Sequence, residues 1–517
     1  MNGLHYPITV RKSIPTSWRS IPAVRQVPFI QDNQIANFTD LGGKIQVKYL
    51  KIFSAVTISL VITSFGCRRE KIIPPIKSDN TPQILFSKTF GGDQEEYFGT
   101  IVRTADGGYL MAGNTSSPNG SGDIPSVPSV GGNLDMFIVK MGPDGNKQWV
   151  TTIGGDNNDY ARSIAVCPDG TGYMIAGYSA SSSSGDIPVT RGEFDMAIVK
   201  IDLNGKKQWV KTFGGYGSDE AHSITVSKDG RSFIVAGSTT TDNDGDIPKI
   251  HTKQFPFFSE IIVLSLTSDG NLQWIKNYGG NFSEDVRSII ASPDGSGYVM
   301  AGYTSSDNNG DIPPAHDKSN GLSDMLALKI GLDGTKQWIK TFGGKGFDWV
   351  TDVAPKLGGN GYVFTGMTEC NGTGDIPGSM GESDMVAIEL DADGNKKWLK
   401  TYGGDNIDDA FAINVLPDGD YLLTGNTATN GNGDVPKNHT AGIASMDLMI
   451  VRIHSDGSKK WARTYGGNNN DQGAAAALAN DGAFVICGLT ASNNNFDVPA
   501  NHGGQGVNDG WVIKVKD

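Results

Sequence analysis

The sequence has little of what long helices and membrane spans require. Apolar residues make up only 38% of the 517 residues, while glycine occurs 69 times. This balance argues against a helical bundle and is typical of short strands joined by many turns. The apolar run at 52–65 has about 14 residues, whereas a membrane-spanning helix needs about 20.

Positive charge and cysteine are also scarce. The formal net charge is −13 and no long block of Lys or Arg occurs, so we expect no nucleic-acid partner. The four cysteines are Cys67, Cys167, Cys370 and Cys487, and their spacing fits neither a zinc site nor a redox motif. Cys167 and Cys487 lie within strand-like patterns, which predicts that they are small buried apolar residues.

No catalytic signature is present. The chain contains no Gly-x-Ser-x-Gly motif, and the serine-rich stretch Ser181–Ser184 has no nucleophile elbow around it. Carboxylates are so evenly spread that no pair stands out for acid–base work. We therefore expect neither an enzyme nor an organic cofactor.

The first 82 residues are typical of an export leader and a tether. A basic start, Lys48–Lys51, precedes the apolar run, which ends at Gly66-Cys67. This order resembles a bacterial lipoprotein signal at 48–66 and implies that Cys67 carries lipid in the mature protein, anchored to the cell envelope at the outer membrane, on its periplasmic or surface side. An ordinary cleaved signal and an uncleaved anchor are the alternatives. Residues 1–47 are expected either to result from a start codon assigned too early or to form a disordered extension. Residues 67–82 are expected to form a flexible tether.

A strand that runs into Gly-Gly recurs six times with tryptophan at its third position. The copies are 60 to 65 residues apart, at Trp149, Trp209, Trp274, Trp338, Trp398 and Trp461. Such a period indicates an array of identical supersecondary units. A seventh copy without tryptophan, Phe86–Gly92, stands alone at the front. The aromatic residue at the tryptophan position recurs in every unit, and this predicts that it packs between neighbouring units.

Each unit predicts four short antiparallel strands. In the second unit these are 160–166, 172–178, 195–201 and 207–213, and Asp-Gly or Asn-Gly pairs form the tight turns between them. Seven such sheets around an axis make an all-β, seven-bladed β-propeller over 83–517. The last unit stops after its third strand, so we predict that the orphan N-terminal strand completes the last blade and closes the ring.

A set of short motifs recurs in the same order and resembles the bacterial β-propeller repeat family called SBBP. The motifs are Gly-Gly-x3-Asp, Pro-Asp-Gly, Gly-Tyr-Thr-Ser, Asp-Ile-Pro and Asp-Met-x3-Lys-Ile. The resemblance covers residues 84–517. It implies a seven-bladed propeller on exported bacterial proteins and assigns no biochemical activity.

In this fold the loops from strand four to the next strand one, and from strand two to strand three, leave the same face. They are long and rich in Asn, Asp, Ser and Gly, so this loop-rich face is the candidate binding surface.

An acidic residue follows each Gly-Gly by four positions, at Glu96, Asp159, Asp219, Glu284, Asp348, Asp408 and Asp471. A second acid recurs in each Asp-Ile/Val-Pro, at Asp123, Asp186, Asp246, Asp311, Asp375, Asp434 and Asp497.

Two hypotheses account for these acidic rings. Hard cations such as Ca²⁺ take several oxygen ligands, and Asp159, Asp219, Asp348, Asp408 and Asp471 are the candidates. The alternative, which we favour, is that each carboxylate accepts backbone N–H bonds and fixes its own loop. Four histidines share the slot three residues after the loop proline, and a joint metal site is the weaker explanation for them: His251, His316, His439 and His502.

Together these features predict a monomeric, non-enzymatic propeller lipoprotein that binds a protein or a glycan on its loop-rich face. Binding specificity would lie in the irregular loops Thr239–Glu260, Thr304–Ser323 and Thr427–Ser445. The alternative is an envelope polysaccharide hydrolase or lyase that uses the axial pocket.

Overall fold

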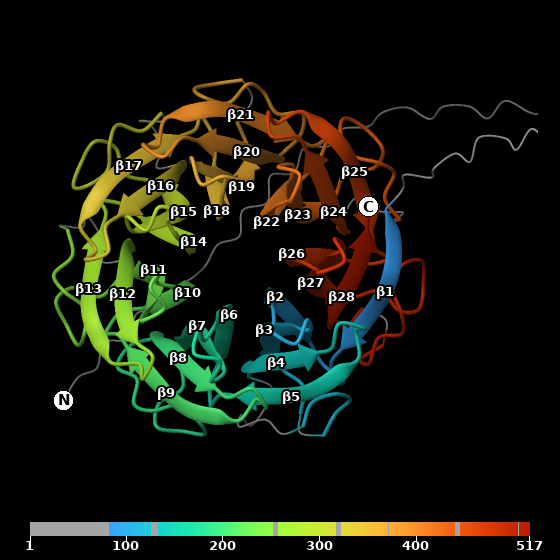
Figure 1. The fold of residues 1–517 in the computed structure, drawn as a ribbon, viewed down its shortest axis with the longest axis horizontal. Helices are drawn as coiled ribbons and strands as arrows, with labels where there is room; N and C mark the ends of the chain where they lie inside the picture. Colours follow the sequence, from blue (N-terminus) through green and yellow to red (C-terminus); the bar gives the residue numbers. More distant parts are fainter. Residues whose placement is uncertain are drawn as a thin grey trace, which may run out of the picture. The chain divides into compact units, whose positions relative to one another are not determined.

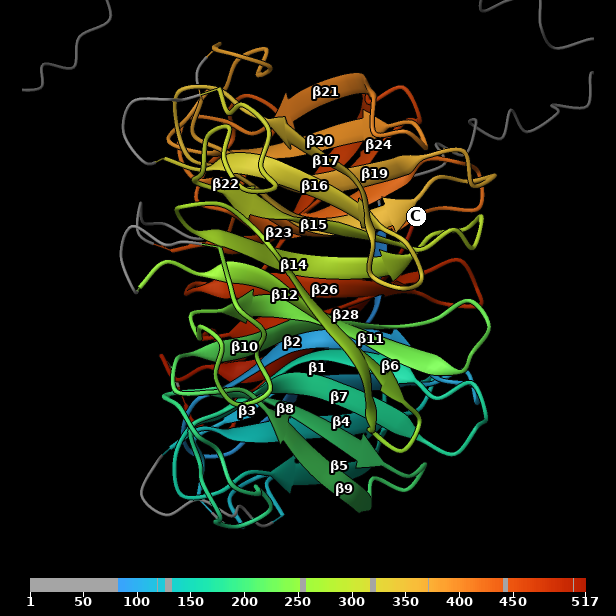
Figure 2. The same ribbon diagram turned by 90° about the vertical axis from the view of Figure 1, so that its left-hand side faces the viewer.

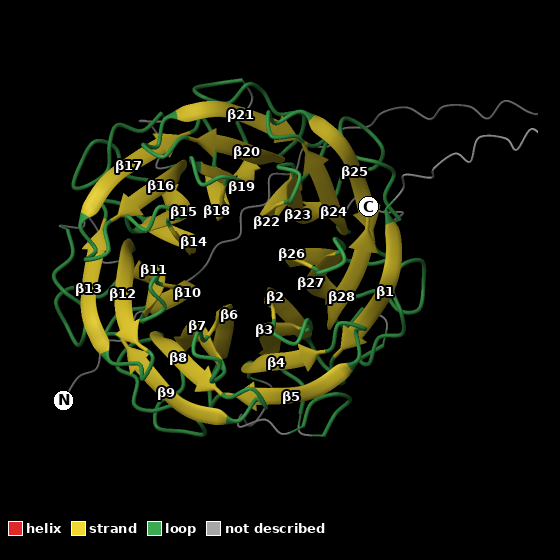
Figure 3. Cartoon of the chain, viewed as in Figure 1, coloured by secondary structure: helices red, strands yellow, loops and turns green. Residues whose placement is uncertain are grey.

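Seven four-stranded antiparallel sheets stand around a central axis in the computed structural model (Figures 1 and 3). The described residues are 82–517, apart from 119, 126–132, 252–256, 317–321, 371, 440–444 and 505. Cys67 and the leader and tether predicted before residue 82 lie outside them. The described part contains no helix long and apolar enough to cross a membrane.

The blades follow the chain in order, and each begins with its innermost strand. Blades 1 to 4 comprise, in order, β2 (Glu96–Arg103), β3 (Tyr109–Thr115), β4 (Asp135–Met141), β5 (Lys147–Ile153); β6 (Asp159–Val166), β7 (Tyr173–Ser179), β8 (Asp195–Ile201), β9 (Lys207–Phe213); β10 (Asp219–Val226), β11 (Ser232–Thr239), β12 (Glu260–Thr267), β13 (Leu272–Tyr278); β14 (Glu284–Ala291), β15 (Tyr298–Thr304), β16 (Asp324–Ile330), β17 (Lys336–Phe342).

Blades 5 and 6 repeat this arrangement, and blade 7 combines the two ends of the chain. Their strands are β18 (Asp348–Pro355), β19 (Tyr362–Thr368), β20 (Asp384–Leu390), β21 (Lys396–Tyr402); β22 (Asp408–Val415), β23 (Tyr421–Thr427), β24 (Asp447–Ile453), β25 (Lys459–Tyr465); β26 (Asp471–Leu478), β27 (Phe484–Thr490), β28 (Asp509–Lys516) and β1 (Gln83–Phe90).

The predicted ring closure is confirmed. Strand β1 pairs antiparallel with β28, from Gln83 opposite Lys516 to Phe90 opposite Gly510. The N-terminal strand therefore forms the outer edge of the last blade, as it must if every third strand is to have a fourth beside it. In Figure 1 the blue β1 lies beside the red β28.

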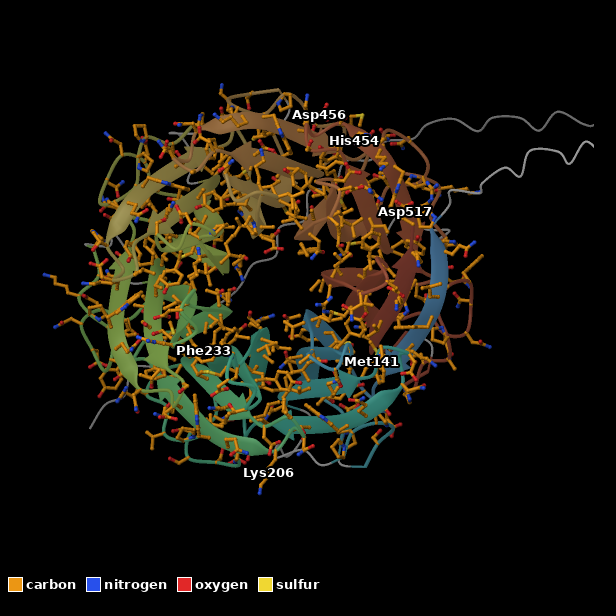
Figure 4. All side chains as sticks on the ribbon, viewed as in Figure 1. Met141, Lys206, Phe233, His454, Asp456 and Asp517 are labelled. Atoms are coloured by element: carbon orange, nitrogen blue, oxygen red, sulfur yellow. The ribbon has the colours of Figure 1, made fainter. Side chains whose placement is uncertain are left out.

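The core lies between the blades. The two middle strands of a blade are buried on both faces, as in β3 and β4, because neighbouring sheets cover them. Met141 and Phe233 lie in this interior, whereas Lys206 points outward from the rim (Figure 4). Cys167 and Cys487 are buried as predicted.

The recurring tryptophan packs one blade against the next, as the sequence predicts. The Trp149 indole donates a hydrogen bond to the Leu203 carbonyl of blade 2 over 3.2 Å, and Trp338 and Trp398 make the same bond in their blades. A Cβ on Gly205 would lie 2.6 Å from the Trp149 ring, so this turn must be glycine for the indole to fit beneath it.

Candidate ligand-binding site

The two sets of long loops meet on one face of the ring. In blade 2, the Asp186 amide of the strand-two-to-three loop donates to the Gly154 carbonyl of the preceding Gly-Gly over 2.7 Å. The same pairing recurs in the other six blades. Figure 2 shows loops leaving both edges of the ring, and the loop-rich face is the one that carries these pairs.

The first acidic ring holds this face together. Each acid is the first residue of an innermost strand, is fully buried, and accepts the amide hydrogen of the second glycine of its own Gly-Gly at 2.6 to 2.9 Å. The last residue of strand two, a Ser or Thr, donates its hydroxyl to the same carboxylate in every blade. The backbone contact is the one predicted for loop-fixing acids, and the hydroxyl contact is an addition that was not predicted from the sequence.

A further donor comes from the residue two positions later. It is a hydroxyl in blades 2, 3, 6 and 7, and in blade 5 it is the Cys370 thiol, 3.0 Å from Asp348. Burial raises the pKa of Asp159 and Asp348 to about 6, although the donors act in the opposite direction.

The second acidic ring lies between neighbouring blades. Asp123, Asp186, Asp311, Asp375 and Asp434 each form an ion pair with the lysine that begins strand four of their own blade. Five acids of this ring face an arginine or a histidine side chain of the preceding blade: Asp123, Asp246, Asp311, Asp375 and Asp497.

That side chain is one of the four predicted histidines, or Arg191 in blade 2. The imidazole of His316 lies 3.3 Å from Asp324 of its own blade and 3.0 Å from Asp375 of the next. His251, His439 and His502 repeat the arrangement at three other interfaces. The four histidines therefore lie at four separate blade interfaces, and each contacts an acid of its own blade and an acid of the next blade. The hydrogen bond that the His502 imidazole donates to the Asp509 carboxylate raises the pKa of His502.

Within the described ranges, no three His, Cys, Asp or Glu side chains are grouped so that they could hold a metal ion. The candidate calcium ligands Asp159, Asp219, Asp348, Asp408 and Asp471 each lie in a different blade and bind the donors given above.

A β-bulge in every innermost strand points one residue toward the axis. The register shifts between the second and fourth residues after each ring acid, which leaves the third unpaired. The glycine opposite is required, because a Cβ on Gly177 would lie 1.7 Å from the Tyr160 carbonyl oxygen. Unlike the ring acids, the bulged residues differ from blade to blade: Gly99, Arg162, His222, Arg287, Thr351, Phe411 and Ala474.

All seven bulged residues line a central cavity of about 470 Å³. Aromatic side chains next to them complete the lining. The lining comes from the first residues of the innermost strands and the last residues of the second strands, so the cavity lies toward the loop-rich face. Its size falls within the range of small-molecule sites.

One wall of the cavity is basic and consists of Arg162, His222 and Arg287 from three consecutive blades. The Arg162 guanidinium lies 5.1 Å from the ring centroid of Tyr178 and donates to its hydroxyl. The Tyr178 ring meets His222 edge to face at 6.1 Å. Side chains from blades 2 and 3 are thus in direct contact along this wall.

A single buried carboxylate behind the wall links blades 3 and 4. Asp285 lies 3.3 Å from His222 and 2.9 Å from Arg287. Burial alone would raise the pKa of Asp285, but His222 and Arg287 hold it below its ordinary value. Glu220, 3.7 Å from His222, is the other acid on this side.

An aromatic wall adjoins the basic one, because Tyr303 lies in the same blade as Arg287 and Trp349 lies in the next blade. The Tyr303 and Trp349 rings stack with centroids 5.2 Å apart and planes at 23°, and the Trp349 indole donates to Ser323. Phe411 is 40% exposed and lines the same cavity. The cavity therefore offers flat aromatic surfaces beside cationic ones.

The outer loops carry the other exposed aromatic side chains. Among the described residues, five aromatic side chains are markedly exposed, and four of them lie in the long loops of this face: Tyr216, Phe257, Phe347 and Phe496. Parts of the three loops predicted to hold specificity, 252–256, 317–321 and 440–444, lie outside the described residues.

Phe496 breaks the repeat at a conformational cost. It has φ of 47°, in the left-handed region, at the position where the other six blades have glycine before Asp-Ile/Val-Pro. The ring is 68% exposed and lies 5.0 Å from His439. An exposed aromatic residue in a strained backbone conformation is a feature that often marks a functional site.

The bulged residues were not identified by sequence reasoning. Part of the signal is present, because the third residue after each ring acid varies from blade to blade and a glycine recurs near the end of each strand two. Recognising it requires the knowledge that this strand is innermost and bulged.

No known protein-family profile matches the chain. The "Regulatory protein FlaEY" of Caulobacter vibrioides is 25% identical over 453 residues, which cover 83% of this chain and 40% of that protein. The "Uncharacterized WD repeat-containing protein L264" of Acanthamoeba polyphaga mimivirus is 27% identical over 144 residues, or 26% of this chain and 10% of that protein. The chain thus spans less than half the length of these curated relatives.

Among solved structures, the chain is similar to "Kuenenia stuttgartiensis Hydrazine Synthase", with a TM-score of 0.43 and 12% identity. The match covers 80% of this chain and 95% of that one.

Proposed function

We propose that this protein is a non-enzymatic binding propeller that presents its loop-rich face to a protein or a glycan. The observation that carries the proposal is the exposed aromatic set on this face, above all the strained Phe496. Aromatic side chains contribute large contact areas at low entropic cost and are enriched in binding surfaces. Similarity to a protein named as regulatory agrees with a role in binding.

The hydrolase alternative receives less support. Hydrolysis of a polysaccharide by the usual route needs two carboxyl groups that reach the substrate. Among the described residues that line the axial cavity none is Asp or Glu. Asp352, whose pKa burial raises to about 6, accepts bonds from Ser288 and the Ile413 amide and thereby ties blades together.

A glycan array probed with the purified protein tests the proposal for glycans, and a panel of purified envelope proteins tests it for proteins. We expect a bound ligand that is lost from the Phe496→Gly and Tyr216→Ser variants. The matched control is Leu332→Ser, which removes an exposed apolar side chain from a tight turn on the opposite face. Equal loss in Leu332→Ser, or no ligand in either panel, would contradict the proposal.

The proposal includes export and a lipid anchor at Cys67. The basic, apolar, Gly-Cys order of 48–67 motivates it, and several acyl chains are expected because a single chain holds a protein only marginally at a membrane. Mass spectrometry of the N-terminal peptide from the membrane fraction should find lipidated Cys67 as the first residue. A mature N-terminus elsewhere, or an unmodified Cys67 thiol, would refute the anchor.

A further inference from the structure

The axial cavity differs in charge from the rest of the chain. The protein contains 56 acidic residues and has a net charge of −13. Yet the described lining of this cavity contains two arginines and a histidine and no carboxylate. Basic side chains in a lining without carboxylates concentrate positive potential there.

The basic wall is built and held in place. The His222 side chain is 4% exposed, and its Nε2 lies 3.3 Å from Asp285. The Nε of Arg162 is buried without a hydrogen-bond partner. Arg287 is held by Asp285 on one side and remains 42% exposed. The two guanidinium groups of the wall thus contain donors that the protein itself does not fully use.

The two acids behind the wall do not remove its preference for an anion. Asp285 and Glu220 orient His222 and Arg287 and neutralise part of their charge. They are not part of the cavity lining, so a ligand would meet the guanidinium groups first. Guanidinium groups bind carboxylates through paired N–H donors.

The aromatic wall adds a second requirement on the ligand. Trp349 and Phe411 offer flat apolar faces, and Thr351, Asn426 and Gln472 offer hydroxyl and amide groups. A ring with one apolar face, several hydroxyl groups and a negative charge would contact all of these. We infer that the axial cavity binds a carboxylate-bearing sugar, with its carboxylate on Arg162 and Arg287 and its ring against Trp349.

This inference rests on the proposed function, because it names the ligand class for the cavity that lies toward the same face. It also adds a claim that can fail separately. Phe496 and Tyr216 belong to the outer loops, whereas the sugar would be held by residues of the innermost strands. The two sets of variants therefore report on different parts of the face.

The test is calorimetric titration of the purified protein with three sugar pairs. The pairs are D-galacturonate and D-galactose, D-glucuronate and D-glucose, and D-mannuronate and D-mannose, whose members differ only in carrying a carboxylate or a hydroxymethyl group. We expect at least one uronate to bind at least tenfold more tightly than its neutral partner. Added salt should weaken that binding. If no uronate binds better than its neutral partner, the inference is wrong.

Variants then locate the binding site. Arg287→Gln should weaken uronate binding at least tenfold, Phe411→Ala should weaken both members of a pair, and Arg231→Gln, which alters an exposed turn on the opposite face, should change neither. Phe411→Ala guards against misfolding of Arg287→Gln, because Phe411 is exposed and its removal leaves no charge unpaired. Unchanged uronate binding in a folded Arg287→Gln protein would overturn the inference. The proposed function stands in that case if ligand binding still depends on Phe496, and falls if it does not.

Discussion

Each buried acid at the start of an innermost strand is held by donors from its own blade and from the loop that leads into it. For Asp348 these are the Gly344 amide, the Thr368 hydroxyl and the Cys370 thiol. An asparagine in its place would turn an amide group toward some of these donors. We expect Asp348→Asn to lower the free energy of unfolding by about 1 kcal/mol, measured by urea denaturation.

The control for this variant is Asp156→Asn, an exposed acid in a Gly-Gly loop, which should change stability by less than about 0.5 kcal/mol. Calcium should raise the melting temperature of neither variant nor of the parent protein. A calcium-dependent melting temperature that disappears in Asp348→Asn would show that the acidic ring binds metal.

Phe496 gives the opposite expectation for stability. Glycine occupies the left-handed conformation at little cost, whereas other residues lose roughly 1 kcal/mol there. Phe496→Gly should therefore raise stability by about that amount while it weakens ligand binding. Asn494→Gly is the control, because Asn494 also has positive φ but asparagine tolerates it. A destabilised Phe496→Gly protein would mean that the ring is part of the fold.

At the scale of the element, β1 is the strand on which ring closure depends. Its removal would expose the edge of β28, and unpaired edges promote aggregation. Deletion of Gln83–Phe90 together with all preceding residues should abolish cooperative thermal unfolding. Deletion of residues 1–78 alone should leave unfolding unchanged. Cooperative unfolding at the parent's melting temperature without β1 would refute the closure.

The strands themselves could be predicted because period, turn chemistry and burial agree in this chain. Asp202–Gly205 marks a tight turn, and the apolar run after Asp195 marks a strand covered on both sides. Arg162 could not be placed in the same way. Its direction depends on a bulge opposite Gly177, a relation between two strands that no local pattern expresses.

The whole ring carries many buried acids, which should make its stability depend on pH. Burial raises the pKa of Asp159, Asp348, Asp352 and Asp384 to about 6 and that of Asp447 to about 7. An acid with a raised pKa stabilises the fold fully below its unfolded pKa near 4, and this contribution is lost as pH rises through the folded value.

We therefore expect a higher melting temperature near pH 5 than at pH 8, measured by calorimetry. His502 acts in the same direction, because its raised pKa favours the charged form in the fold and that contribution is lost as pH rises. Asp447→Asn should reduce the difference between the two pH values. A melting temperature that rises from pH 5 to pH 8 would contradict this explanation.

At the same scale, the central claim is that the repeating carboxylates build the ring while residues that break the repeat bind the ligand. The most direct measurement is calorimetric titration of the strongest ligand from the panels into the parent protein, Asp348→Asn and Phe496→Gly. We expect Asp348→Asn to keep the parent's Kd within twofold and Phe496→Gly to bind at least tenfold more weakly. Loss of binding in a folded Asp348→Asn protein, with Phe496→Gly unchanged, would contradict the claim.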